Sequence, residues 1–405
     1  MIPPAPAKAA RRAKKPLFSR ATVIAIVLAL GGVVALVAIS ESRRGGASSQ
    51  GDDDDDGDTK KKKKKKGGGD EDDEDDDAYS KSAEPKIPAS VENGRVDPRD
   101  VSRGSGRAVK PSAKEVDKAS ELSFSPDTDP YCQNQGRLTD IVKSVGYDID
   151  RELRKAASIA DAEEEKIGEE LYAELLASPK FRGKVDTPSM ADARRYIAEL
   201  AVPLLVSVQR KGIVYDFHTV DDDDINAFAM PGGHIYFYRG ILEAPKRIEN
   251  EAQIAGVLAH EINHIDRRHT IAIFEYLKRI GTISGQAEEM GPVIIGMARH
   301  PFSTKQEDES DQFAVKFLMA AEYSPKQFVT MWQNWDSLDK NPKKRGGNDP
   351  ITDEIEELLN THSHPARRAC NAMRVVNANK PKAVSRYYVG TTNYREKQVR
   401  ARKQY

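Results

Sequence analysis

The longest uninterrupted apolar stretch of the chain lies near the N-terminus. Residues 21–40 read ATVIAIVLALGGVVALVAIS and contain no charged side chain. Twenty residues of this kind are enough for a helix to cross the hydrocarbon core of a bilayer. Six basic residues precede the stretch, whereas Arg43 and Arg44 follow it closely. Because basic residues favour the cytoplasmic side, the pattern predicts a basic cytoplasmic segment 1–20, a single-pass transmembrane anchor at 21–40, and an extracytoplasmic (periplasmic) location for the rest of the chain.

A cleaved secretory signal is the alternative interpretation of this stretch. Ala38, Ile39 and Ser40 resemble a small-residue cleavage site, and cleavage there would release a secreted protein. The apolar run is longer than the roughly 7 to 15 residues usual for a signal sequence. We therefore expect an uncleaved anchor.

A strongly charged segment follows the apolar stretch. Residues 41–115 contain few large apolar side chains but include GDDDDDGD, seven consecutive lysines at 60–66, and DEDDEDDD. Such a composition buries too little apolar surface to offset the entropy lost on ordering, so we expect a disordered linker. The acidic runs flank the lysines and compete for them, which favours a solvated spacer over a tract that binds polyanions. We expect no nucleic-acid partner.

The rest of the chain shows mainly helical periodicity, interrupted by a short β-rich part. Helices are expected at about residues 136–176, 190–210, 250–269, 304–321 and 325–338, with a last one beginning near residue 365. The alternating segment 212–220 (GIVYDFHTV) and the segment 235–238 (IYFY), which follows a Pro-Gly-Gly turn, predict two strands. This order predicts one α+β domain at residues 130–385, mainly helical with a small antiparallel sheet, and a basic C-terminal tail at 386–405.

The chain contains two cysteines, Cys132 and Cys370. An extracytoplasmic location permits a disulfide between them, which would join the beginning of the domain to its end. Two buried free thiols are the alternative. The sequence alone does not decide between them.

The helix expected at 250–269 is apolar almost all round, so its ionisable residues are informative. His260 and His264 are four residues apart and lie on one face of a helix, where both imidazoles can reach a single ion. Glu261 beside them can contact water bound to that ion, as in the HExxH zinc motif. Two core histidines bonded to backbone carbonyls are the alternative, but a buried unpaired charge is heavily penalised. Metal ligation accounts for all three residues.

A catalytic zinc also needs a third protein ligand. The segment KQEDESD at 305–311 carries several acidic residues on an expected helix. Glu307 and Asp311 share one face of it, so one of them can bind zinc while the other accepts the second N–H of a ligating histidine. A solvated acidic helix face is the alternative reading of the cluster.

Several segments in a fixed order resemble metallopeptidase family 48, the HtpX-like and CAAX prenyl proteases, and specifically the extracytoplasmic branch with a soluble domain. DDDDINAFAMPGGHIYFYRGIL is similar to the NAFALPGG strand and turn of that family. NEAQIAGVLAHEINH is similar to its HExxH helix, and EDESDQFAVKFLMAAEYSPKQF to its ExxAD helix. The resemblance covers about residues 160–380 and implies a gluzincin-like zinc metallopeptidase domain.

The resemblance also implies individual roles. His260, His264 and Glu307 would bind one Zn2+ per chain, Glu261 would act as the catalytic acid and base, and Asp311 would support a ligating histidine. Two positions depart from the family pattern, because Ser310 replaces the usual alanine and Asn263 a usual glycine or alanine. Neither change removes a ligand.

The last family segment matches less well. Family members carry a threonine, histidine and proline near the end, with an arginine six residues after the histidine, whereas this chain reads THSHPARR at 361–368. Aligning His362 retains the spacing to Arg368, and aligning His364 retains the proline. We favour His362 with Arg368, and expect both to border the zinc, where they would stabilise the oxyanion or cap the metal.

The segment Asn226, Ala227, Phe228 and Ala229 is expected to form an edge strand beside the metal, on which an extended polypeptide substrate can pair by β-augmentation. An ordinary interior strand is the alternative. The overall expectation is a membrane-anchored zinc metalloendopeptidase that acts on misfolded or misassembled envelope proteins. A zinc-containing, non-hydrolytic chaperone or assembly scaffold of the cell envelope is the alternative function, although such a protein would not need Glu261.

Overall fold

The computed structural model of the chain describes the region that carries the motifs above. The described residues are 87–101, 115–119, 122–125, 132, 159–243, 248–272, 274–275, 302, 304–340, 365–379, 386–397 and 399. All of them fall within one unit, formed by Ala78–Arg279 and Ile283–Tyr405. The transmembrane anchor expected at 21–40 lies outside the described residues. Within the described part, no helix combines the length and the apolar character needed to cross a membrane.

Helices make up most of the described chain, as expected. The α-helices are α4 (Asp161–Ala177), α5 (Ala191–Leu205), α6 (Arg239–Glu243), α7 (Glu251–Asp266), α10 (Thr304–Ala320), α11 (Pro325–Lys340), α13 (Pro365–Ala378) and α14 (Thr391–Glu396). Short 3-10 helices are η1 (Ala89–Asn93), η4 (Pro188–Met190) and η5 (Pro231–Gly233). The strands are β1 (Arg95–Val96), β2 (Val116–Lys118), β3 (Tyr215–Val220), β4 (Ala227–Ala229), β5 (His234–Tyr238) and β6 (Arg386–Tyr388). Together they form the expected α+β arrangement.

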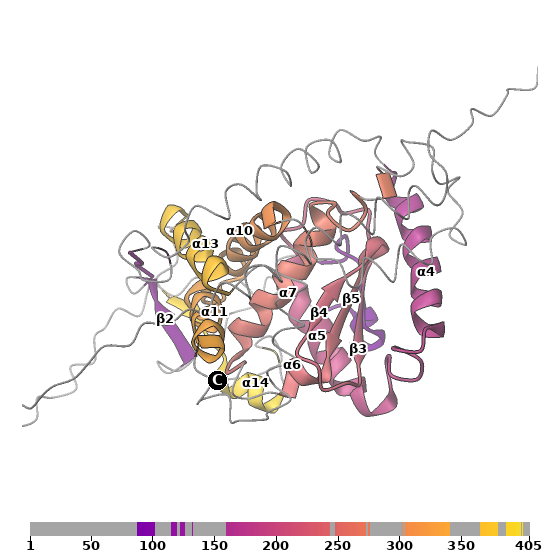
Figure 1. Ribbon diagram of the computed structural model, residues 1–405, viewed down its shortest axis with the longest axis horizontal. Coiled ribbons are helices and arrows are strands. Elements are labelled where there is room, and N and C mark those ends of the chain that lie inside the picture. The colour runs from indigo at the N-terminus through magenta and orange to yellow at the C-terminus, as the bar shows by residue number, and fades with distance from the viewer. Residues whose placement is uncertain are drawn as a thin grey trace, which may run out of the picture. The chain divides into compact units, whose positions relative to one another are not determined.

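The main sheet has the strand order β1-β3-β5-β4, with α4 on one side and α7 on the other (Figure 1). The strands β1 and β4 pair antiparallel with β3 and β5, but β3 and β5 pair parallel to each other. The expectation of an antiparallel sheet is therefore wrong for the central pair. The reason is that β4 reverses the chain between them, so that β5 returns in the direction of β3.

A turn made of Pro231, Gly232 and Gly233 joins β4 to β5. Both glycines have positive φ, 80° and 94°, which side chains other than glycine rarely adopt. A Cβ on Gly233 would lie 2.0 Å from the carbonyl oxygen of Val214. The turn therefore needs glycine for both its conformation and its packing.

Helix α7 is the central helix of the domain, and every one of its residues is buried. It begins at the cap Asn250, whose side chain accepts a hydrogen bond from the backbone N–H of Gln253 at 3.0 Å. Helices α10 and α11 pack against it. A Cβ on Gly256 would lie 2.4 Å from the ring of Phe328 on α11, so this glycine permits the close approach of the two helices.

The folded region extends beyond the expected boundaries at both ends. In the segment expected to be linker, β1 pairs with β3, and Val91 and Val96 are fully buried. In the segment expected to be a tail, β6 pairs with β2 in a second, two-stranded sheet, and Tyr387 and Tyr388 are fully buried. The expectations of a linker through residue 115 and of a tail from residue 386 are thus wrong for these parts. A few apolar residues among many charged ones are enough to attach both ends to the domain.

The disulfide left open by the sequence is present in the structure. Cys132 and Cys370, on α13, are joined, with 5.3 Å between their Cα atoms. Because 238 positions separate them, the bond closes a large part of the chain into one loop.

Candidate metal centre

Two imidazoles and one carboxylate converge where α7 meets the first turn of α10. The Nε2 atoms of His260 and His264 lie 3.0 Å apart. The carboxylate oxygens of Glu307 lie 3.4 Å from Nε2 of His260 and 3.3 Å from Nε2 of His264. The helical period that places the histidines one turn apart accounts for half of this geometry, and the packing of α10 on α7 supplies the rest.

The donor set is almost completely removed from water. His260, His264 and Glu307 are each at most 1% exposed. Burial of a carboxylate is costly unless an opposite charge compensates it. Two histidines and one glutamate are a ligand set used by catalytic zinc, which takes three protein ligands and keeps one position open. The residues present therefore fit a divalent ion of this type.

Asp311 and Arg368 form a hydrogen-bonded unit behind the ring of His260. The Oδ1 atom of Asp311 lies 2.9 Å from Nδ1 of His260, and Arg368 donates to both oxygens of the same carboxylate. The guanidinium also stacks on Trp332, with 3.8 Å between Cζ and the ring centre. Nδ1–H of His260 can therefore donate to Asp311, so that Nε2 is the nitrogen left to bind a metal ion.

The charges of this unit determine its protonation. Burial alone would raise the pKa of Asp311, but Arg368 and His260 lower it below its usual value. Burial and Arg368 oppose protonation of His260, but Glu307 and Asp311 outweigh them and raise its pKa to about 9. Burial lowers the pKa of His264 well below its usual value. The two ligating imidazoles are therefore electrostatically distinct before a metal binds.

His264 has surroundings that the sequence motifs did not reveal. Its ring stacks on Phe302, with 3.7 Å between ring centres and an interplanar angle of 20°. Its Nδ1 lies 3.2 Å from Nδ1 of His269, which in turn lies 3.2 Å from the hydroxyl of Ser310. Ser310, at the position of the family's alanine, thus contacts the polar group that supports His264. In the sequence, these surroundings were indicated only by a third histidine, His269, five residues after the end of the motif.

The remaining expected site residues lie around this centre or outside the described part. Glu261 is 1% exposed and follows His260 directly on α7. Arg368 is part of the site, but it contacts His260 through Nδ1, on the side of the ring away from Glu307. The two roles expected for Arg368, stabilising the oxyanion or capping the metal, stay predictions. His362 and His364 lie outside the described residues.

The expected substrate segment forms the edge of the main sheet as far as the structure describes it. Strand β4 covers Ala227–Ala229, pairs with β5, and packs against α7. Asn226 lies just before it, and its carbonyl accepts a hydrogen bond from the backbone N–H of Tyr238 at 3.0 Å. The hydrogen bonds of Tyr238 with Asn226 and of Met230 with His234 alternate along the pair, so the backbone groups of Ala227 and Ala229 point away from β5.

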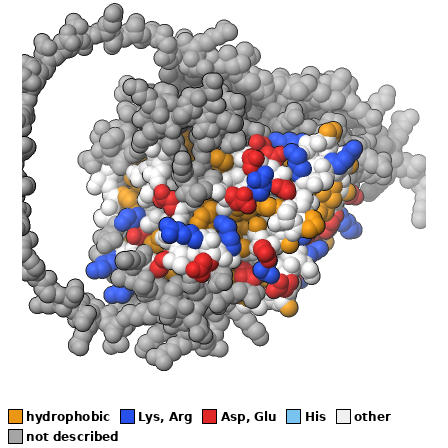
Figure 2. Space-filling model, turned by 90° about the horizontal axis from the view of Figure 1, so that it is seen from below, with side chains coloured by type: hydrophobic (Ala, Val, Ile, Leu, Met, Phe, Trp, Pro, Cys, Tyr) orange, Lys and Arg blue, Asp and Glu red, His pale blue; other side chains and the backbone are white. Residues whose placement is uncertain are grey.

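The described surface carries interspersed charges around small hydrophobic areas. Figure 2 shows acidic and basic side chains next to one another on one face, where no histidine is visible. The histidines at 218, 234, 260, 264 and 269 are all at most 4% exposed. The described histidines therefore make their contacts in the interior of the protein and not at its surface.

Comparison with known proteins identifies the family of this domain. Residues 190–374 match the family described as peptidase family M48. Mitochondrial metalloendopeptidase OMA1 of Saccharomyces cerevisiae is 30% identical over 169 residues, which cover 40% of this chain and 46% of that protein. The beta-barrel assembly-enhancing protease of Escherichia coli is 24% identical over 237 residues, which cover 54% of this chain and 46% of that protein. Metalloprotease YcaL of Escherichia coli is 26% identical over 221 residues, which cover 51% of this chain and 81% of that protein.

The chain spans about half the length of the first two of these relatives. All three are named as proteases, and two of them as metalloproteases or metalloendopeptidases. Residues 190–374 thus form a domain of metallopeptidase family M48.

Proposed function

We propose that the chain is a membrane-anchored zinc metalloendopeptidase. The observation that carries the proposal is the convergence of His260, His264 and Glu307 in a buried site, with the two histidine Nε2 atoms 3.0 Å apart. These three residues would hold one zinc ion per chain. When bound to such a set, zinc supplies a bound water with a pKa of about 7 and polarisation of the scissile carbonyl.

The protein groups around this set have separate tasks. Glu261, next to His260, accepts the proton of the attacking water and returns it to the leaving amine. Asp311 accepts the hydrogen bond from Nδ1 of His260 and so holds Nε2 toward the ligand position. Arg368 keeps Asp311 ionised and in place. This assignment makes Arg368 a positioning residue instead of an oxyanion contact.

His362 keeps its proposed place at the border of the zinc site. The spacing to Arg368, which lies in the site, is the argument for it. Replacement of His362 by alanine should change turnover or the access of chelators to zinc. If both stay at the wild-type level, His362 has no such role.

The edge strand β4 provides the proposed contact with the substrate backbone. The groups of Ala227 and Ala229 that point away from β5 can pair with an extended polypeptide. Such pairing binds the backbone of any extended chain and gives little specificity for its side chains. It therefore suits unfolded polypeptides as substrates.

The biological setting of the proposal combines the N-terminal apolar stretch with the relatives. A helix at residues 21–40 would anchor the chain, with the catalytic domain outside the cytoplasm and held away from the bilayer by the charged linker. The relatives named for the assembly of β-barrels and for mitochondrial endopeptidase activity favour misfolded or misassembled membrane and envelope proteins as substrates. The alternative, a zinc-containing scaffold without hydrolysis, is disfavoured by Glu261.

Cleavage of an unfolded protein by the purified full-length chain tests this function. The chain, kept in detergent, should contain zinc and cleave casein but not a stably folded protein. A chelator should abolish cleavage, and added Zn2+ should restore it. Casein left intact by the zinc-loaded chain would favour the scaffold.

A further inference from the structure

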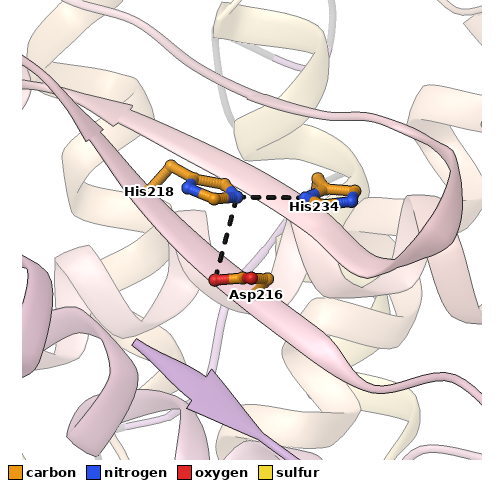
Figure 3. A group of neighbouring side chains, drawn as sticks. All are labelled: Asp216, His218 and His234. Carbon is orange, nitrogen blue, oxygen red and sulfur yellow. Dashed lines mark hydrogen bonds and ion pairs between the residues drawn. The ribbon is translucent and has the colours of Figure 1, made fainter. Parts of the chain in front are cut away.

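A second group of metal-ligating side chains lies on the other face of the main sheet. Asp216 and His218 come from β3, and His234 is the first residue of β5 (Figure 3). Asp216 and His234 are partners in the parallel register, and His218 lies two residues further along β3, so the three side chains share one face. Phe217, Ile235 and Phe237 point to the opposite face and join the core around α7. The group is therefore separate from the centre on α7.

The ligand atoms of the three side chains all lie within 4.8 Å of one another, somewhat further apart than those of the first centre. Nε2 of His218 lies 3.0 Å from Nδ1 of His234 and 3.8 Å from Oδ1 of Asp216. Both histidines are at most 2% exposed, and Asp216 retains a side-chain exposure of 13%. Two imidazole nitrogens and one carboxylate oxygen within reach of one point are a donor set for first-row transition metals.

A further carboxylate prepares His218 for ligation. Oδ2 of Asp186 lies 2.7 Å from Nδ1 of His218, and Oδ1 of Asp186 accepts from the backbone N–H of Thr219. A hydrogen bond from Nδ1–H to Asp186 leaves the lone pair of Nε2 directed at His234 and Asp216. Carboxylates bonded to the second nitrogen of a histidine are typical of metal sites. Asp186 thus contacts Nδ1 of His218 in the same way as Asp311 contacts Nδ1 of His260.

Two features compete with a metal ion at this position. A hydrogen bond from Nδ1–H of His234 to His218 would by itself explain the 3.0 Å contact, but it does not explain why Asp216 converges there. Arg194 contacts both carboxylates, at 2.9 Å from Asp216 and 3.3 Å from Asp186. Arg95, on β1 and half exposed, lies 3.9 Å from Asp216 as well, so the two carboxylates face two partly exposed guanidinium groups. A cation that binds Asp216 must therefore displace Arg194 and Arg95 from this carboxylate.

We propose that Asp216, His218 and His234 bind a second divalent transition ion of the class of Zn2+ or Ni2+. The ion would join β3 to β5 directly after the Pro-Gly-Gly turn, and so brace the strand on which β4 pairs. Tyr172 of α4, which is partly exposed, stacks on both imidazoles, with 4.6 Å and 5.3 Å between ring centres. It closes the site toward solvent, which suits a structural ion better than a catalytic one.

Calorimetric titration of Zn2+ into the metal-free full-length protein tests the proposal. The wild type should bind two strong equivalents. His234→Gln should retain one, and Asp186→Asn should bind the second equivalent about 10- to 100-fold more weakly. Asp192→Asn, which removes an exposed carboxylate from α5, is the matched control and should bind two. A variant of the first centre, Glu307→Gln, identifies which equivalent belongs to α7. The proposal is overturned if the wild type binds a single strong equivalent, or if His234→Gln binds as the wild type does.

Arg194→Gln provides a second test, in which the affinity for the second equivalent should rise instead of fall. This variant keeps the proposal testable if loss of a buried histidine unfolds the protein. Removing this competing guanidinium should tighten the second equivalent by tenfold or more and leave the first unchanged. Circular dichroism checks the fold of each variant. An Arg194→Gln protein without a tighter second equivalent would overturn the proposal as well.

Discussion

Arg368 and Asp311 form a two-point ion pair in the interior of the domain. Nη2 of Arg368 lies 2.6 Å from Oδ1 of Asp311, and Nε lies 3.0 Å from Oδ2. The two side chains are 3% and 1% exposed. Because Asp311 also accepts from Nδ1 of His260, the pair connects helix α13 to a ligand of the candidate metal centre.

Replacing Arg368 by glutamine should therefore affect both stability and metal binding. Loss of one member of a buried pair typically costs about 3 to 5 kcal/mol, and weaker support of His260 should lower zinc affinity about 10- to 100-fold. Arg367→Gln is the matched control, because Arg367 pairs with Asp308 in a more exposed position and should contribute at most about 1 kcal/mol. Urea unfolding and chelator competition measure the two effects. Equal results for the two variants would contradict the role of Arg368.

The edge strand should respond to removal of a single backbone donor. Ala229→Pro removes the N–H that points away from β5, so we expect a higher KM for an unfolded substrate and little change in the melting temperature. Ala229→Val enlarges the side chain about as much as proline does but keeps the N–H, so the KM of this variant should stay close to the wild-type value. Steady-state cleavage of one fluorogenic peptide gives both values. If proline and valine act alike, the backbone of β4 does not hold the substrate.

The bond between Cys132 and Cys370 should contribute to stability. A disulfide that closes a long loop typically contributes about 2 to 4 kcal/mol, chiefly by restricting the unfolded chain. We expect no reactive thiol in the unfolded, unreduced protein, and a lower melting temperature after reduction or in a Cys132→Ser/Cys370→Ser variant. Two reactive thiols per chain in denaturant would show that the bond does not form.

The sequence predicted the features that depend on local periodicity, and the α+β class with them. His260 and His264 share a face because a helix has 3.6 residues per turn, and the apolar surroundings marked that helix as central. The contact of Glu307 with both histidines needed the family resemblance, since Glu307 follows both of them by more than 40 positions.

Features that depend on distant pairing could not be predicted in the same way. The parallel register of β3 and β5 brings Asp216, His218 and His234 together, and no local pattern indicates that register. The strands β1 and β6, which attach the two ends of the folded region, have only two and three residues and so show almost no periodicity in the sequence. Arg368 could be placed near the site by spacing, but its pairing with Asp311 depends on how α13 packs against α10.

The most direct test of the central claim is a comparison of the wild-type chain with Glu261→Gln for zinc content and for cleavage of an unfolded protein. Glu243→Gln, at an exposed glutamate on α6, is the control. We predict that Glu261→Gln keeps the zinc content of the wild type and loses about 100- to 10,000-fold in kcat, the range that one acid or base catalyst contributes. A Glu261→Gln protein with full zinc content and wild-type cleavage would contradict the proposed peptidase mechanism.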